Sequence, residues 1–559
     1  MSITWKQFER YWYIAALCVT VASLPFSKLG LSIGQMMLAG GWIVERFDYR
    51  KFIAAMSAQT AGKRILLALP LSLSLLFKGI LSGFRQFLTN KPALVFSSIF
   101  LFHILGLVIT TDFDYALKDL RTKFPLLLLP LVIATSEAFE KRAFYRIMLL
   151  FVLAVLIRSG YNTWMIATHR FVDIREVSQN VSHIIFSLLL TLGIYALIYF
   201  LLKKRIFNFW EKGLFLVILT WMFVYIIVSQ SFTGFSISVI AMLVLIPVLV
   251  FKTRKRWLKT ALILSFLVIT SALVMSLKSV IDDFYKVNPV DLSNLETTTS
   301  RGNPYIHDYY STQTENGNLL WIYVQWDEMR GAWNKRSHLD FDSLNRKNET
   351  VAYTVVRYLT SKGCRKDGDA VDKLTQKEVV AIENGVANYL FLEKFSVRGR
   401  IYEFLWGFDN YMKTGNPTGS TLMQRIEFWK ASVGIIKDNW LTGVGTGDMN
   451  LAFKDQYVKM QTKLTPDQRW RSHNQFLSIL VGFGIFGFLW FIFAIFYPPI
   501  ALHRLDDYFF LTFLIIALSS MLAGDTIESQ TGVSFFAIFY CLFLFARKEK
   551  DEIINKINN

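Results

Sequence analysis

Long apolar runs constrain this chain more than any other feature of its 559 residues. With 53% hydrophobic and 18% charged residues, the composition excludes a disordered chain and an ordinary soluble domain. Stretches of about 18 or more mostly apolar residues can cross a bilayer as helices. The sequence therefore predicts an all-α polytopic membrane protein with about 12 transmembrane helices, at 11–27, 29–45, 93–110, 124–138, 147–165, 182–201, 213–229, 234–251, 260–278, 475–497, 509–523 and 531–546.

The basic residues predict the orientation, because cytoplasmic loops carry an excess of Lys and Arg. With the N-terminus inside and 12 spans, both termini and the four densest basic clusters face the cytoplasm: 141–146, 203–205, 252–259 and 547–548. A thirteenth apolar run, 65–84, would turn the later clusters outward if it crossed. We therefore expect 65–84 to be re-entrant or interfacial.

This topology divides the chain into a membrane domain of about nine spans (1–278), a large outer loop (279–474) and a three-span segment (475–559). The net charge of +18 is compatible with nucleic-acid binding in a soluble protein. However, residues 280–474 contain 25 basic and 24 acidic residues, so a net charge of +17 belongs to the remainder. The excess charge therefore reports orientation, and we expect no nucleic-acid partner.

The outer loop has helical patterning, most clearly over 421–438. Its apolar residues recur at spacings of three and four, which predicts an amphipathic helix. Gly443, Gly445 and Gly447 follow in the most glycine-dense stretch of the chain. This stretch predicts a tight turn; in the alternative interpretation its backbone N–H groups hold phosphate or sugar oxygens.

Motifs for cofactors and catalytic metals are missing from the sequence. Cys18, Cys364 and Cys541 stand singly, and no HExxH, CxxC, Walker A or GxSxG pattern occurs. We therefore expect no cofactor and no metal. The rival signal is the Asp-x-Asp pair, which occurs at 112–114, 340–342 and 367–369.

His473 lies in the sequence Arg471-Ser472-His473-Asn474, directly before the span at 475–497. Ser472 or Asn474 can cap that helix, and its N-terminus carries partial positive charge. Such an end attracts phosphate and disfavours a protonated imidazole, so that His473 can act as a general base. The alternative is a purely structural histidine at a helix cap.

The span continues with Gly484 and Gly487, so that His473-Asn474 is followed by nine residues and Gly-x-x-Gly. This pattern resembles the signature of the O-antigen ligase family, His-(Asn/Ser/Gln)-x9-Gly-x-x-Gly at the end of a large periplasmic loop. The segment from Arg425 to Trp429 and the stretch 443–447 are also similar to that family. The resemblance is strongest over about 421–490.

The resemblance implies a metal-independent membrane glycosyltransferase of the GT-C type in the bacterial inner membrane. Such an enzyme moves a glycan from undecaprenyl pyrophosphate to a lipid A–core acceptor at the periplasmic face. His473 matches the family's proposed base, and Arg425 matches an arginine that binds the donor pyrophosphate, which a guanidinium can bind bidentately. Arg471, Arg121 and Arg175 are further candidate donor ligands.

One position departs from the family pattern. Many ligases carry Ser-Arg-Thr-Gly at the outer end of a middle span, and this chain has Phe232 in place of the arginine. Either another outer cation substitutes, or donor binding differs, or the protein is not an active ligase. By topology, Lys123, Arg158 and Arg170 join Arg121 and Arg175 as candidate substitutes.

Other functions share parts of this pattern. A polymerase of lipid-linked repeat units, or a ligase that glycosylates Ser or Thr of exported proteins, would use the same donor and the same histidine. A transporter or flippase is a remote alternative, because transporters place ionisable residues near the bilayer midplane. Here the polar residues are concentrated in the outer loop instead.

Overall fold

The computed structural model describes residues 5–58, 61–169, 177–178, 181–203, 206–392, 396–418 and 420–551. Over these residues the protein is all-α apart from one short hairpin, as predicted. It forms two compact units. The membrane unit comprises Met1–Phe266, Phe428–Thr462 and Pro466–Asn559, and the loop unit comprises Leu267–Glu427 and Lys463–Thr465.

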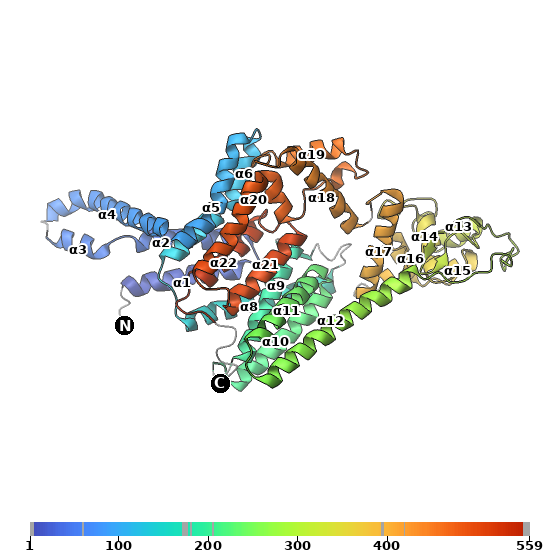
Figure 1. Ribbon diagram of the computed structural model, residues 1–559, viewed down its shortest axis with the longest axis horizontal. Helices are drawn as coiled ribbons and strands as arrows, with labels where there is room; N and C mark the ends of the chain where they lie inside the picture. The colour runs from blue at the N-terminus through green and yellow to red at the C-terminus, as the bar shows by residue number, and fades with distance from the viewer. Residues whose placement is uncertain are drawn as a thin grey trace. The chain divides into compact units, whose positions relative to one another are not determined.

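The membrane unit is built from helices throughout (Figure 1). They are α1 (Trp5–Ser23), α2 (Lys28–Glu45), α3 (Tyr49–Ser57), α4 (Ala61–Thr89), α5 (Lys91–Leu105), α6 (Phe113–Lys123), α7 (Pro125–Thr135), α8 (Lys141–Thr168), α9 (His183–Leu202), α10 (Phe209–Val228), α11 (Phe232–Lys252), α19 (Met449–Lys459), α20 (Gln475–Ala501), α21 (Tyr508–Ala523) and α22 (Gln530–Leu544), with the 3-10 turns η1 (Gly106–Ile109) and η4 (Pro466–Gln468). Two unit boundaries fall within α12 (Arg256–Tyr285) and α18 (Thr421–Asp438), and the other two flank residues 463–465. The bounds of α18 confirm the helix predicted over 421–438.

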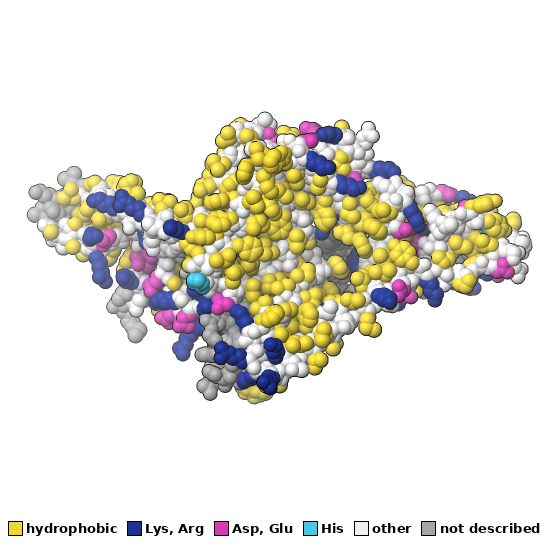
Figure 2. Space-filling view, in the orientation of Figure 1, with side chains coloured by type: hydrophobic (Ala, Val, Ile, Leu, Met, Phe, Trp, Pro, Cys, Tyr) yellow, Lys and Arg dark blue, Asp and Glu magenta, His cyan; other side chains and the backbone are white. Residues whose placement is uncertain are grey.

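Eight of the described helices are long and apolar enough to cross a membrane. They are Leu67–Thr89, Lys91–Ile109, Lys141–Thr168, His183–Leu202, Phe209–Val228, Phe232–Lys252, Arg256–Tyr285 and Gln475–Ala501. The predicted number of about 12 is therefore not confirmed over the described residues. The apolar helices α7, α21 and α22 have only 11, 16 and 15 residues, and charged side chains occupy the first turns of α1. The protein is a multi-pass membrane protein, and hydrophobic side chains cover much of the face shown in Figure 2.

The run at 65–84 lies within α4, a continuous helix of 29 residues that contains Pro70. Leu67–Thr89 has the length and apolarity of a span. The placement of 65–84 as re-entrant or interfacial remains a prediction.

Helix α22 shows how an apolar helix shorter than a membrane span is accommodated in the membrane unit. Every side chain from Thr531 to Leu544 is buried. Its aromatic rings pack against neighbouring helices, and the Tyr540 ring stacks on Phe96 with centroids 3.9 Å apart. A helix that is apolar all round and enclosed by other helices buries its surface against protein. Length matched to the bilayer is therefore not required of α22.

A buried carboxylate holds the C-terminal segment to this helix bundle. The Asp551 carboxylate accepts hydrogen bonds from the hydroxyls of Tyr145 and Tyr199 at 2.7 and 2.6 Å, and its Oδ1 lies 2.8 Å from Lys141 Nζ. Burial alone would raise the pKa of Asp551, but hydrogen bonds from Lys141, Tyr199 and Tyr145 outweigh burial and lower it. Asp551 is therefore held as an anion.

The loop unit has its own hydrophobic core. It contains the strands β1 (Thr314–Glu315) and β2 (Asn318–Leu319) and the helices α13 (Trp326–Asn334), α14 (Val351–Ser361), α15 (Gly368–Asp372), α16 (Gln376–Glu383), η3 (Tyr389–Phe391) and α17 (Val397–Thr414). Trp333, Phe341 and Tyr358 are fully buried in that core. The buried guanidinium of Arg357 pairs with Glu315 at 3.0 Å and lies 3.8 Å from the ring centroid of Trp406.

Candidate functional site

His473 is held in a bent backbone immediately before α20. Its φ of 45° lies in the left-handed region, which few residues other than glycine adopt. The imidazole is half-buried, and its ring lies 5.6 Å from the ring of Phe428 and 6.4 Å from that of Trp470, centroid to centroid. The aromatic neighbours therefore restrict the orientation of the imidazole.

Asn474 caps α20, as the sequence predicts for this position or for Ser472. Its side-chain oxygen accepts hydrogen bonds from the backbone N–H groups of Phe476 and Leu477 at 3.0 and 3.2 Å. Its amide also donates to the carbonyl of Leu522 at 3.1 Å. His473 consequently sits at a capped helix N-terminus, where the helix carries partial positive charge.

Arg471 belongs to a buried cluster of charges that the sequence does not reveal. The Glu528 carboxylate accepts hydrogen bonds from Lys123 at 2.8 Å, from Arg471 at 3.3 Å and from the Gln475 amide at 2.9 Å. Lys123 also donates to Asp119 at 2.6 Å. Two cations and two carboxylates thus compensate one another beside the His473 segment.

The charges in this cluster stabilise one another. Burial would raise the pKa of Glu528, but Lys123 and Arg471 outweigh burial and lower it. Burial would likewise lower the pKa of Lys123 and of Arg471, but the attraction of Glu528 together with that of Asp119 and other neighbours outweighs burial and raises both. All three groups are therefore ionised at neutral pH.

A second carboxylate anchors the same segment. Ser472 Oγ and Ser478 Oγ are 2.7 Å apart, and they donate hydrogen bonds to Asp525 Oδ1 at 3.3 and 2.7 Å. Asp525 and Glu528 both lie between α21 and α22. Their position as acidic residues between two apolar runs is the one signal by which the sequence could have identified them.

The glycine-rich stretch forms a turn that docks against α20. The N–H groups of Val444 and Gly445 donate to the carbonyls of Val481 and Gly482, each at 2.9 Å. Next to this contact α20 is kinked at Gly484, with φ 61° and ψ −164°. A Cβ at Gly484 would lie 2.3 Å from the carbonyl oxygen of Leu441, so glycine is required there.

The other end of the same turn docks against the end of α5 and η1. Gly447 N–H donates to Thr110 Oγ1 at 3.1 Å, and the Asp448 carboxylate accepts from the N–H groups of Thr111 and Asp112 at 2.9 and 2.8 Å. The N–H groups of 444, 445 and 447 are thus already hydrogen-bonded within the protein. The alternative interpretation, in which they hold a phosphate, is wrong for these groups; the tight turn is the observed structure.

The remaining motif residues have structural neighbours. A Cβ at Gly443 would lie 2.3 Å from the backbone of Gly482, and one at Gly487 would lie 2.2 Å from the side chain of Phe483. Trp429 lies on α18, and its indole N–H is buried without a hydrogen-bond partner among the described residues. Gly443 therefore permits close backbone approach, as its small size predicts, and Gly487 leaves room for the Phe483 side chain of its own helix.

The candidate arginines differ in their surroundings. Arg425 is half-buried on the part of α18 that belongs to the loop unit. Arg121 is exposed near the end of α6. Arg158 is 7% exposed on α8, stacks 5.2 Å from the Tyr161 ring centroid, and has no described carboxylate within ion-pair distance. Arg170 and Arg175 lie outside the described residues.

Phe232 occupies the first residue of α11 and is 55% exposed. Ser231 caps this helix, because its hydroxyl accepts a hydrogen bond from the N–H of Gly234 at 3.0 Å. The stretch that aligns with Ser-Arg-Thr-Gly is therefore an ordinary helix start here, and it brings no cation.

The Asp-x-Asp pairs have local partners in the structure. Asp112 caps α6, and Asp367 caps α15. Asp369 pairs with Arg301 at 2.7 Å, and Asp342 pairs with Arg330 at 2.8 Å. Over the described ranges, no group of three or more His, Cys, Asp or Glu side chains could hold a metal ion.

Comparison with known families identifies the segment that carries these residues. The family model described as O-Antigen ligase matches residues 385–492. This range includes Arg425, the turn at 443–447, His473 and the glycines of α20. A search of curated proteins finds no match. Residues 385–492 of this multi-pass membrane protein thus match the O-antigen ligase domain, as the motif around His473 predicts.

Proposed function

We propose that this protein transfers a glycan from undecaprenyl pyrophosphate to a hydroxyl of a lipid A–core acceptor on the periplasmic side of the bacterial inner membrane. One observation carries the proposal: within the O-antigen ligase domain, the motif histidine His473 lies at the capped N-terminus of α20. A neutral imidazole at such a position can accept a proton. The helix end also favours a nearby phosphate.

The proposed reaction needs a base and charge neutralisation, and no redox chemistry. His473 takes the proton from the acceptor hydroxyl, and the acceptor oxygen bonds to the anomeric carbon of the donor glycan. The bond between that carbon and the phosphate oxygen breaks, and its electron pair leaves with undecaprenyl pyrophosphate. Cationic side chains stabilise the negative charge that develops on the leaving group.

Arg425 and Arg471 have different parts in this proposal. Arg425 binds the donor pyrophosphate, because it matches the family's arginine and lies on a helix whose polar edge is not fully buried. The guanidinium of Arg471 is already paired with Glu528, so it positions the His473 segment. This differs from the donor-binding role that the sequence alone suggests for Arg471.

Transfer in vitro tests the catalytic role of His473. The full chain in detergent is supplied with an undecaprenyl-pyrophosphate-linked glycan and lipid A–core, with and without EDTA. His473→Ala should reduce the rate at least about 100-fold, because general-base catalysis contributes about that much or more. The matched control is His503→Ala, since His503 is exposed beyond the other end of α20. Full activity of a folded His473→Ala variant would contradict the proposed base.

The choice of acceptor separates the proposed ligase from its alternatives. Transfer to lipid A–core supports the ligase, transfer to a second lipid-linked unit indicates a polymerase, and transfer to Ser or Thr of a polypeptide indicates protein glycosylation. Deletion of the gene gives an independent readout. Free core together with lipid-linked polymer is expected for a ligase, and core that carries a single unit is expected for a polymerase.

A further inference from the structure

A cavity of about 480 Å³ opens between α9, α10 and α11 of the membrane unit, three helices that lie side by side in Figure 1. Most of its lining is aliphatic or aromatic, including Ile198, Leu202, Ile227, Met242 and Leu249. We call it the α9–α11 groove. Its volume is within the range of about 300–1,000 Å³ that is usual for ligand sites.

The groove opens sideways, toward the position of lipid around a membrane helix. Leu202, Phe223 and Ile227 line it and are nevertheless 61, 47 and 58% exposed. Its hydroxyl groups are already engaged: Tyr195 donates to the carbonyl of Ser238 at 2.7 Å. Water in such a cavity would find few hydrogen-bonding partners, so a hydrocarbon chain is the occupant that the lining favours.

Charge and aromatic residues gather at one end of the groove. Among the described lining residues Lys203 alone is charged; its Nζ donates to the Tyr199 hydroxyl at 2.6 Å and lies 3.7 Å from the Asp551 carboxylate. Lys252 follows Leu249 by one helical turn on α11, and Arg254 follows shortly after. Both cations are exposed and have no described carboxylate within ion-pair distance.

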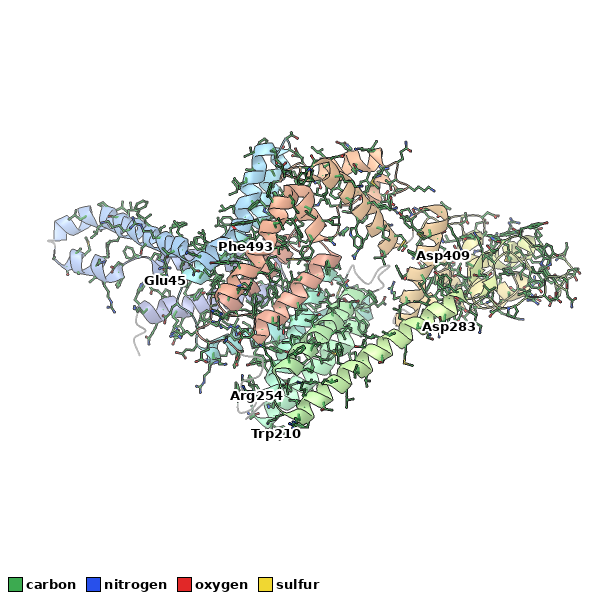
Figure 3. All side chains as sticks on the ribbon, in the orientation of Figure 1. Glu45, Trp210, Arg254, Asp283, Asp409 and Phe493 are labelled. Carbon is green, nitrogen blue, oxygen red and sulfur yellow. The ribbon has the colours of Figure 1, made fainter. Side chains whose placement is uncertain are left out.

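Exposed aromatic rings mark the same end as the level of the lipid headgroups. Trp210 lies in the first turn of α10 and is 82% exposed, and Phe251 lies in the last turn of α11 and is 85% exposed. Figure 3 shows Trp210 and Arg254 at the same end of the helix bundle, and Figure 2 shows basic side chains gathered there. Aromatic residues are enriched at membrane interfaces, and basic residues there attract anionic lipid headgroups.

We propose that the α9–α11 groove binds one acyl chain of an anionic phospholipid, whose phosphate lies against Lys252 and Arg254. The apolar lining holds the chain, and the cations select the headgroup. A zwitterionic phospholipid offers the same chain without net negative charge, so it binds more weakly. This site is independent of glycan transfer and of His473.

Native mass spectrometry of the full chain in detergent tests the headgroup preference. The probes are phosphatidylglycerol and phosphatidylcholine with identical acyl chains. One tightly bound phosphatidylglycerol is expected, and Lys252→Gln/Arg254→Gln should weaken it about fivefold for each cation removed. The matched control is Arg142→Gln/Arg146→Gln, two exposed cations at the start of α8, which should leave binding unchanged.

A second pair of variants tests the groove itself. Met242→Trp fills it and should weaken phosphatidylglycerol binding at least about tenfold, whereas Val244→Trp places the same ring on the exposed face of α11 and should not. Equal binding of the two lipids to the wild type, or equal binding by both tryptophan variants, would overturn the proposal. Tighter binding of undecaprenyl phosphate than of phosphatidylglycerol would also overturn it. If Met242→Trp does not fold, the headgroup comparison decides.

Discussion

Replacing Glu528 by glutamine removes the negative charge that Lys123 and Arg471 share. At the observed distances of 2.8 and 3.3 Å, each attraction is worth about 5–6 kcal/mol before desolvation, for an effective dielectric constant of about 20. The substitution also relieves the burial cost of the carboxylate, which is several kcal/mol. We therefore expect Glu528→Gln to lower the free energy of unfolding by about 3–5 kcal/mol, as for other buried pairs that lose one partner.

A double-mutant cycle separates charge imbalance from a packing defect. In Glu528→Gln two buried cations keep only the attraction of Asp119 and Asp525, whereas adding Lys123→Met leaves Arg471 as the single cation beside these carboxylates. The double variant should be more stable than Glu528→Gln by about 2 kcal/mol, because residues within one charge network do not act additively. The control is Glu137→Gln, whose carboxylate is 69% exposed and should contribute little.

SDS-induced unfolding of the purified chain in mixed micelles measures these differences. Glycan transfer is measured on the same samples at a temperature where each variant is folded. Reduced transfer by folded Glu528→Gln is expected, because Arg471 lies two residues before His473. Stability within 1 kcal/mol of the wild type, or additive effects in the cycle, would refute the reasoning.

Three further outcomes are expected. Asp551→Asn should lower the free energy of unfolding by about 3 kcal/mol at neutral pH. Because the folded pKa of Asp551 is lowered, the stabilisation by its carboxylate is present above the unfolded pKa and is lost as the pH falls through the folded pKa. The unfolding curves of wild type and variant should therefore converge in acid. Gly484→Ala should lower the free energy of unfolding by about 3 kcal/mol or more, since the φ of this residue is positive and the added Cβ would meet the Leu441 carbonyl. Gly160→Ala, with open space around the added Cβ, should be tolerated. Similar unfolding midpoints of the two variants would contradict the role of Gly484. Arg158→Gln should raise the KM for the lipid-linked donor about tenfold if this buried guanidinium replaces the cation that Phe232 lacks, and an unchanged KM in a donor titration would exclude that role.

The sequence predicts best where the physical cause is local. The helix over 421–438 and the cap at Asn474 follow from spacing and residue type within one segment. The number of full-length spans does not follow, because α22 is short and enclosed by other helices. Apolarity is the same whether a helix faces lipid or protein, so composition cannot distinguish these two environments.

The charge cluster could not be predicted, because its partners are distant in sequence. Glu528 lies 57 residues after Arg471 and 405 after Lys123. From the sequence alone, such cations are expected to bind an external anion, because the carboxylate of Glu528 that neutralises them is distant in the chain. The structure supplies Glu528 and Asp119 as internal anions for Arg471 and Lys123, and it leaves Arg158 without one among the described residues.

The contact between Asp448 and the end of α5 has a consequence for the order of biogenesis. Thr111 and Asp112 are synthesised 337 and 336 residues before the carboxylate that accepts their N–H groups. Until the segment around Asp448 has been synthesised, water satisfies those donors, because the contact is exposed. The contact between the turn at 443–447 and the end of η1 therefore forms late, after the early helices have been made.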